Sequence, residues 1–192
     1  RKPLPLQQGY SSPALEVQPS VTTHPLGTLT TPRDTAPMRG LQPFFERNTT
    51  EWAVRWDERS DRPHLIQGVG IPVMPGAGNA LTVADVRRTR GGEPELADID
   101  RLLRDFMNRN PELLRVPAGN LRLDPTRTVS LSGGRMLFVE FQQFHDGIPV
   151  EGANVFFRIN NGNIVQLGAD RVADVSLETG QRIDRATAFA KV

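Results

Sequence analysis

The sequence contains no cysteine and almost no excess of charge of either sign. The absence of cysteine excludes a disulfide framework, a thiolate nucleophile and a thiolate metal ligand. The 23 lysine and arginine residues balance 22 aspartate and glutamate residues, so the chain has no general attraction to nucleic acid or to an anionic membrane. No apolar run approaches the ~20 residues that a membrane helix needs. We therefore expect neither nucleic acid nor a membrane among its partners.

Catalytic motifs are missing as well. The three histidines, His24, His64 and His145, are widely spaced, whereas a zinc protease site of the H-E-x-x-H type needs two histidines one helical turn apart. Gly-x-Ser-x-Gly and the phosphate-binding P-loop are also absent. His145 precedes a turn and is expected to be a solvated turn residue. We expect this chain to have no enzyme activity and no cofactor or metal of its own.

The composition changes along the chain. Residues 1–43 are rich in proline, serine, threonine and glutamine, a composition that favours an extended or disordered N-terminal arm, and they include no apolar h-region of a signal peptide. Residues 44–174 have the apolar periodicity of a folded domain. In it, Trp52–Trp56 alternates as a strand, His64–Ile71 is its returning strand, and 74–79 is a loop.

One helix is predicted clearly, from Pro94 to about Arg109. Its apolar residues recur at helical spacing, and Asn110-Pro111 ends it because proline disfavours helical geometry in the preceding residue. The core is expected to combine this helix with alternating residues of Leu137–Phe141. The helix residues expected in the core are Leu96, Ile99, Leu103 and Phe106.

The second half of the domain is predicted to be an antiparallel meander over about 135–171. Asp146-Gly147 and Asn161-Gly162 separate apolar runs, and such dipeptides supply the positive φ that tight hairpins require. A preceding strand is expected over Leu121–Leu131, weakened by Pro125. Ile183–Ala190 is predicted to begin a helix with Asp184 as its N-cap. The fold class predicted from these elements is α+β.

The segment Gln143–Ala153 (QFHDGIPVEGA) resembles the signature Q-x-x-x-G-[VI]-P-V-x-G-[AG] of the fungalysin/thermolysin propeptide (FTP) domain, with Glu151 departing from the expected apolar residue. The resemblance extends over about Glu93–Arg171. Residues 175–192 resemble the start of a PepSY domain, the usual second half of such propeptides. The fold that this implies is a cystatin-like antiparallel sheet packed on one main helix.

The resemblance also implies a function. The chain would be the propeptide of a secreted zinc metalloprotease, acting as an intramolecular chaperone and temporary inhibitor of its cognate protease domain. The full precursor would be a zinc metalloendopeptidase, with zinc in the downstream domain, and it would act outside the cell. The alternative is a stand-alone FTP/PepSY-type binding or structural module of an extracellular assembly, in which the N-terminal arm reaches a neighbouring subunit.

The motif has a physical interpretation of its own. Gly147 supplies positive φ, Pro149 has no N–H for a ladder, and Gly152 permits a bulge or a close backbone approach. A sheet edge of this kind can pair with a partner chain, although each residue taken singly can also serve only to shape one hairpin. The predicted partner-binding edge consists of Gln143, Phe144, Gly147, Pro149, Val150, Gly152 and Phe156.

Overall fold

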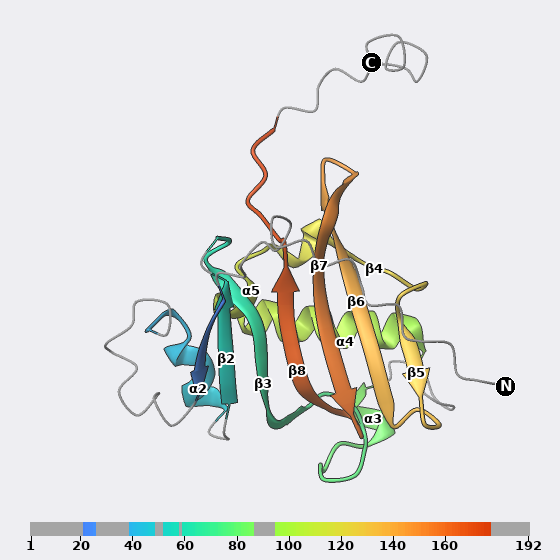
Figure 1. Ribbon diagram of the computed structural model, residues 1–192. Helices are drawn as coiled ribbons and strands as arrows, with labels where there is room; N and C mark the ends of the chain where they lie inside the picture. The colour runs from blue at the N-terminus through green and yellow to red at the C-terminus, as the bar shows by residue number, and fades with distance from the viewer. Residues whose placement is uncertain (1–20, 26–38, 49–51, 58, 87–94, 178–192) are drawn as a thin grey trace, which may run out of the picture.

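The protein has one antiparallel sheet with few helices, an α+β fold (Figure 1). The computed structural model describes residues 21–25, 39–48, 52–57, 59–86 and 95–177. The strands are β1 (Val21–Pro25), β2 (Trp52–Asp57), β3 (Arg62–Pro72), β4 (Leu121–Leu123), β5 (Val129–Leu131), β6 (Met136–His145), β7 (Ile148–Asn160) and β8 (Asn163–Asp170). The helices are α2 (Gln42–Arg47), α3 (Val83–Val86), α4 (Leu96–Arg109), α5 (Pro111–Leu114) and the 3₁₀ turn η3 (Ala118–Asn120).

Seven strands follow one another in the order β1-β2-β3-β8-β7-β6-β4, and β5 pairs with β6 beside β4. The meander β6-β7-β8 confirms the prediction, and both of its turns have the expected backbone. Asp146 and Gly147 have φ values of 49° and 78°, and Asn161 and Gly162 have values of 45° and 77°. Positive φ at both central residues gives the turn a twist that matches the flanking strands.

Helix α4 crosses one face of the sheet (Figure 1). Its first turn is closed by a capping box, in which the Asp98 carboxylate accepts a hydrogen bond from the Glu95 backbone N–H at 3.1 Å. Because Glu95 is the extended N-cap, the helix begins at Leu96, and the predicted first residue, Pro94, lies outside the described residues. The predicted end at Arg109 is confirmed.

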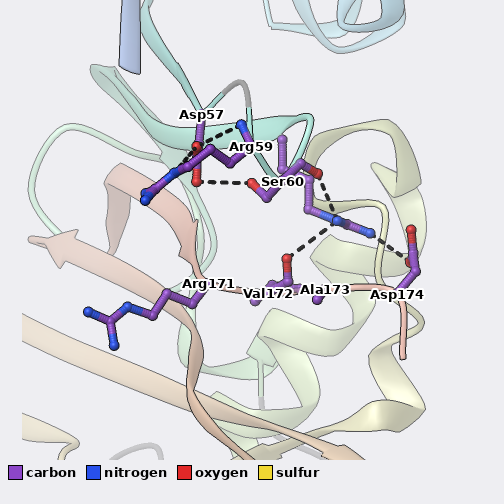
Figure 2. A pocket seen from close by; sticks show the side chains of 8 residues that line it. Asp57, Arg59, Ser60, Arg171, Val172, Ala173 and Asp174 are labelled. Atoms are coloured by element: carbon purple, nitrogen blue, oxygen red, sulfur yellow. Dashed lines mark hydrogen bonds and ion pairs between the residues drawn. The ribbon is translucent and has the colours of Figure 1, made fainter. Parts of the chain in front are cut away.

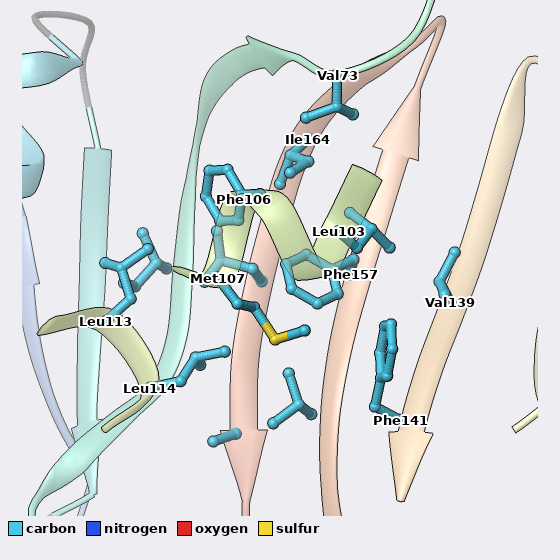
Figure 3. Close-up of a cluster of buried hydrophobic side chains, with 14 of the residues drawn as sticks. Val73, Leu103, Phe106, Met107, Leu113, Leu114, Val139, Phe141, Phe157 and Ile164 are labelled. Carbon is cyan, nitrogen blue, oxygen red and sulfur yellow. The ribbon is translucent and has the colours of Figure 1, made fainter. Parts of the chain in front are cut away.

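The core lies between α4 and the sheet (Figure 3). Phe157 is fully buried and makes edge-to-face contacts with Phe106 and Phe141, each with ring centroids 6.0 Å apart. The buried residues of α4 are Ile99, Leu103, Phe106 and Met107, opposite Val139 and Phe141 of β6. The core prediction was wrong for Leu96, which is 40% exposed because it is the first residue of α4, at the end of the helix nearest the β5 edge of the sheet.

The hairpin of β2 and β3 confirms the predicted strands. Trp52, Val54 and Trp56 are all buried on the same face, as their alternation predicted. β1 pairs with β2, and Leu41, just before α2, is fully buried. These two parts of the predicted N-terminal arm therefore belong to the folded domain. The predicted helix at Ile183–Ala190, with Asp184, lies outside the described residues.

The single strand predicted over Leu121–Leu131 is wrong, since β4 and β5 are separated by a turn. The Asp124 carboxylate accepts hydrogen bonds from the Thr126 backbone N–H at 2.9 Å and from the Thr126 hydroxyl at 2.6 Å. Such an aspartate offers the backbone an alternative to ladder pairing, and Pro125 supplies no N–H to restore the ladder.

A close backbone contact with Val73 and Met74 fixes the turn between β7 and β8. The backbone N–H groups of Val73 and Met74 both donate to the Gly162 carbonyl at 3.0 Å. A Cβ atom at Gly162 would lie 2.2 Å from the Met74 carbonyl oxygen, so only glycine allows this approach. The predicted loop 74–79 is thereby packed against the predicted turn.

Candidate partner-binding site

The hairpin of β6 and β7 extends past the end of β8 (Figure 1). The ladder between β7 and β8 ends where Asn154 pairs with Asp170, so residues 148–153 have no partner in β8. At the tip, Phe144 pairs with Pro149 and His145 pairs with Ile148. In the part of the chain that the structure describes, the β8 side of residues 148–153 is therefore unpaired. This extended backbone forms the core of the candidate site.

A bulge of four residues in β7 opposite one residue in β6 shapes this segment. Gln142 pairs with Asn154 and Phe144 pairs with Pro149, so residues 150–153 lie opposite Gln143 alone. The Gln142 side-chain amide donates to the carbonyls of Val150 at 2.5 Å and Ala153 at 2.9 Å. These carbonyls have no partner in the β6–β7 ladder, so the single amide group of Gln142 fixes the bulge. Gln142 was not among the predicted site residues, because its role depends on the register of the two strands and no local sequence signal indicates it.

The bulge predicted at Gly152 is confirmed by the register of β6 and β7. The φ of Gly152 is +71°, and a Cβ atom there would lie 3.1 Å from a guanidinium nitrogen of Arg171. Only a residue without a side chain combines this backbone conformation with that contact at low cost. Gly152 therefore gives the hairpin its bend and brings it next to the segment that leaves β8.

Gln143 has a different role from the one predicted. Its side chain is buried, with 3% of the residue exposed, and forms two hydrogen bonds with the backbone of Ala173. The amide Nε2 donates to the Ala173 carbonyl at 2.6 Å, and Oε1 accepts from the Ala173 N–H at 3.1 Å. Since both amide groups are used inside the protein, Gln143 positions the chain that follows β8 and does not offer its side chain to a partner.

The exit segment, residues 171–177, is held at two further points, one at Arg62 and one at His145 of the hairpin. Figure 2 shows its first residues, Arg171–Asp174. Arg62 donates to the Val172 carbonyl at 3.4 Å and to the Asp174 carboxylate at 2.7 Å. The His145 Nε2 atom lies 2.8 Å from the Leu177 carbonyl. Because a carbonyl only accepts, Nε2 carries the proton of this bond. His145 is thus a hydrogen-bonding residue with a side chain 24% exposed, and its prediction as a solvated turn residue was wrong.

Six of the seven predicted edge residues lie together on the hairpin. Gly147, Pro149 and Gly152 are exposed and Val150 is half-buried. Phe144 is half-buried under Arg122, whose guanidinium carbon lies 4.1 Å from the ring centroid.

Phe156, the seventh residue, lies farther along β7. Strand alternation places Phe156 on the face opposite Phe157, away from α4. Arg158 lies over its ring at 5.0 Å and over the ring of Phe138 at 4.9 Å. The same arginine pairs with the buried Glu140 at 2.7 Å. This charge-balanced cluster lies on β6 and β7, away from the hairpin tip.

Among the described residues, no group of three or more histidine, aspartate or glutamate side chains is placed to hold a metal ion. The described helices include none with the length and apolar character needed to cross a membrane.

Comparisons with known protein families, with curated proteins and with solved structures found no match. The family resemblance of Gln143–Ala153 therefore stays a prediction.

Proposed function

We propose that this chain is the propeptide region of a secreted zinc metalloprotease, an FTP-type domain that assists folding of the protease domain and then inhibits it. The observation that carries the proposal is the open side of residues 148–153, which lies within the segment of family resemblance. Backbone N–H and C=O groups that lack a ladder partner at a strand edge can pair with an added strand from another protein. In residues 148–153 the carbonyls of Val150 and Ala153 already accept from Gln142, so the other backbone groups on the β8 side are the ones available. The sheet curled over α4 is, in this proposal, the cystatin-like scaffold that presents this strand edge.

The hairpin is suited to binding because it is held in shape before a partner arrives. Gln142 fixes the bulge, and Gln143 and His145 fix the neighbouring exit segment. A segment already ordered in its binding conformation loses less conformational entropy on association. Main-chain hydrogen bonds would supply affinity, and the neighbouring Val150 and Phe144 side chains would supply specificity.

The propeptide would act by binding energy and not by chemistry. It would stabilise the native topology of the protease domain, remain bound as an inhibitor, and be removed by cleavage. Zinc, the catalytic residues and the endopeptidase activity would belong to the protease domain, and the complex would function outside the cell.

The alternative proposal, a stand-alone module of an extracellular assembly, relies on the N-terminal arm reaching a neighbouring subunit. In the described residues, the arm strand β1 pairs with β2 of its own chain. That pairing favours the propeptide over an arm exchanged between subunits. A size measurement separates the two, because the assembly predicts a polymer at all concentrations.

Inhibition of a thermolysin-type protease domain, encoded with this chain, tests the proposed docking surface. Val150→Asp places a charge on the half-buried side chain beside the open edge and should weaken inhibition by roughly tenfold or more. Val129→Asp is the matched control, since Val129 is 43% exposed on β5, which pairs with the end of β6 opposite the hairpin tip. Equal inhibition by the wild type and a folded Val150→Asp variant would remove the hairpin edge from the proposal.

A further inference from the structure

A charged pocket of about 450 Å³ opens between the β2–β3 connection and the exit segment (Figure 2). Asp57, Arg59 and Ser60 form one wall, and Arg171 and Ala173 belong to the other. Pockets of this volume accommodate part of an organic ligand or peptide and exceed what a single ion needs. The pocket adjoins the hairpin through the contact of Arg171 with Gly152.

Two charged residues, Arg62 and Asp57, build the frame of the pocket through hydrogen bonds within the chain. Arg62 is 4% exposed, and its guanidinium donates to the carbonyls of Leu114 and Ser60 at 3.0 and 2.9 Å. Its remaining bonds reach Val172, Arg115 and Asp174, so each of its three nitrogens has a partner. These bonds join the β2–β3 connection, α5 and the exit segment into one rigid wall.

Asp57 is the second frame residue. Its carboxylate accepts hydrogen bonds from the Arg59 backbone N–H at 3.0 Å and from the Ser60 hydroxyl at 3.2 Å. It also pairs with the Arg59 Nε at 3.3 Å. The Arg59 side chain is thereby anchored by Nε, and its two terminal nitrogens make no hydrogen bond with any described residue.

Arg171 supplies a second guanidinium group at the pocket. It is exposed, and it forms no hydrogen bond or ion pair with the described part of the chain. Its φ of +52° lies in the left-handed region, which costs a residue with a side chain roughly 1 kcal/mol. In Figure 2, the guanidinium groups of Arg59 and Arg171 extend toward the same side of the pocket from its two walls.

We propose that this pocket binds a carboxylate-bearing peptide segment, with the free guanidinium nitrogens of Arg59 and Arg171 donating to the carboxylate. The planar guanidinium matches a carboxylate through paired hydrogen bonds. Among the described lining residues, three arginines and two aspartates give a net charge of +1, which suits a carboxylate. This site is distinct from the open strand edge, and its existence does not depend on the proposed protease partner.

Nuclear magnetic resonance titration of the full chain tests the proposal. The probe is the capped tripeptide acetyl-Ala-Glu-Ala-amide, and its matched control carries glutamine in place of glutamate. The glutamate peptide should produce saturable shifts of the side-chain Nε–H signals of Arg59 and Arg171, and the glutamine peptide should not. Because hydrogen bonds to charged groups are the strong ones, Arg171→Gln should weaken binding by roughly tenfold or more.

Three variants complete the design. Arg127→Gln removes an exposed arginine on the β4–β5 turn and should leave binding unchanged. Arg171→Gly removes the same guanidinium as Arg171→Gln. Because glycine favours the left-handed backbone at this position, the variant tests the loss of binding without backbone strain at residue 171. Arg59→Gln should weaken binding as well.

Several outcomes overturn the proposal. Binding of the glutamine peptide with equal affinity would show that the carboxylate is not recognised. Unchanged affinity in folded Arg171→Gly, or an equal loss in Arg127→Gln, would mean that the attraction is not localised in the pocket. Tighter binding of inorganic phosphate than of the glutamate peptide would assign the pocket to a different class of anion.

Discussion

Replacing Gln143 tests whether the exit segment is fixed to the hairpin as described. The Gln143 amide forms two hydrogen bonds with the Ala173 backbone, at 2.6 and 3.1 Å, in a position that is 3% exposed. A protein hydrogen bond contributes a net ~0.5–1.5 kcal/mol, so Gln143→Leu should lower the free energy of unfolding by about 1–3 kcal/mol. Leucine has a similar volume, and the contribution of a new cavity should be small.

A second substitution adds a pH signature. Gln143→Glu keeps the acceptor for the Ala173 N–H but places a carboxylate oxygen against the Ala173 carbonyl. Burial and this repulsion raise the pKa of the new carboxyl above its value in the unfolded chain. A raised pKa contributes stability that is complete below the unfolded pKa and is lost as pH rises through the folded pKa. Gln143→Glu should therefore be closer to wild type at pH 4 than at pH 7.

Urea unfolding followed by tryptophan fluorescence measures the loss of stability in Gln143→Leu and the pH dependence of stability in Gln143→Glu. Trp52 and Trp56 are 1% and 2% exposed, so their emission reports the loss of the core. Amide exchange of Ala173 should accelerate in Gln143→Leu. Gln166→Leu is the control, because the Gln166 side chain forms a single, exposed hydrogen bond with the described residues, to Gln67 at 3.4 Å. A Gln143→Leu variant within about 0.5 kcal/mol of wild type, with unchanged Ala173 exchange, would refute the reasoning.

Three further predictions concern the core, the turns and the response to acid. Leu103→Ala should cost about 2–5 kcal/mol in urea unfolding, whereas the half-exposed Leu96→Ala should cost far less. Gly162→Ala should lower the thermal unfolding temperature more than Gly147→Ala does. Both glycines have positive φ, but only at Gly162 would a Cβ atom meet the backbone, 2.2 Å from the Met74 carbonyl oxygen. Burial raises the pKa of Asp57, but hydrogen bonds and the charge of its partners outweigh burial and hold that pKa below its usual value. A lowered folded pKa contributes stability above the unfolded pKa that is lost as pH falls, so acid unfolding of Asp57→Asn should show a shallower pH dependence.

The regular elements of this fold were predictable because they depend on local signals. Asp146-Gly147 and Asn161-Gly162 define two turns by backbone conformation alone, and these turns set the β6-β7-β8 meander. The apolar stripe of α4 likewise predicts its buried face. Leu96 was misassigned because periodicity gives the face of a helix but not where the sheet beneath it ends.

The irregular parts depend on contacts between segments far apart in the sequence. Arg62 is a buried arginine whose partners include Leu114 and Val172, and nothing near Arg62 in the sequence indicates those carbonyls. Gln142 and Gln143 are adjacent in sequence, yet one fixes a bulge and the other fixes the exit segment. By contrast, the Asp124-Pro125 dipeptide was a usable turn signal, and it would have divided the predicted strand Leu121–Leu131 correctly.

Hydrogen exchange of this chain, alone and with a thermolysin-type protease domain whose catalytic glutamate has been replaced, tests the central proposal most directly. The proposal predicts slower amide exchange in residues 148–153 upon binding, since the open side of β7 would gain a strand partner. Protection confined to other surfaces, or no protection at protease concentrations that saturate any inhibition, would contradict the proposal that this hairpin docks on the protease.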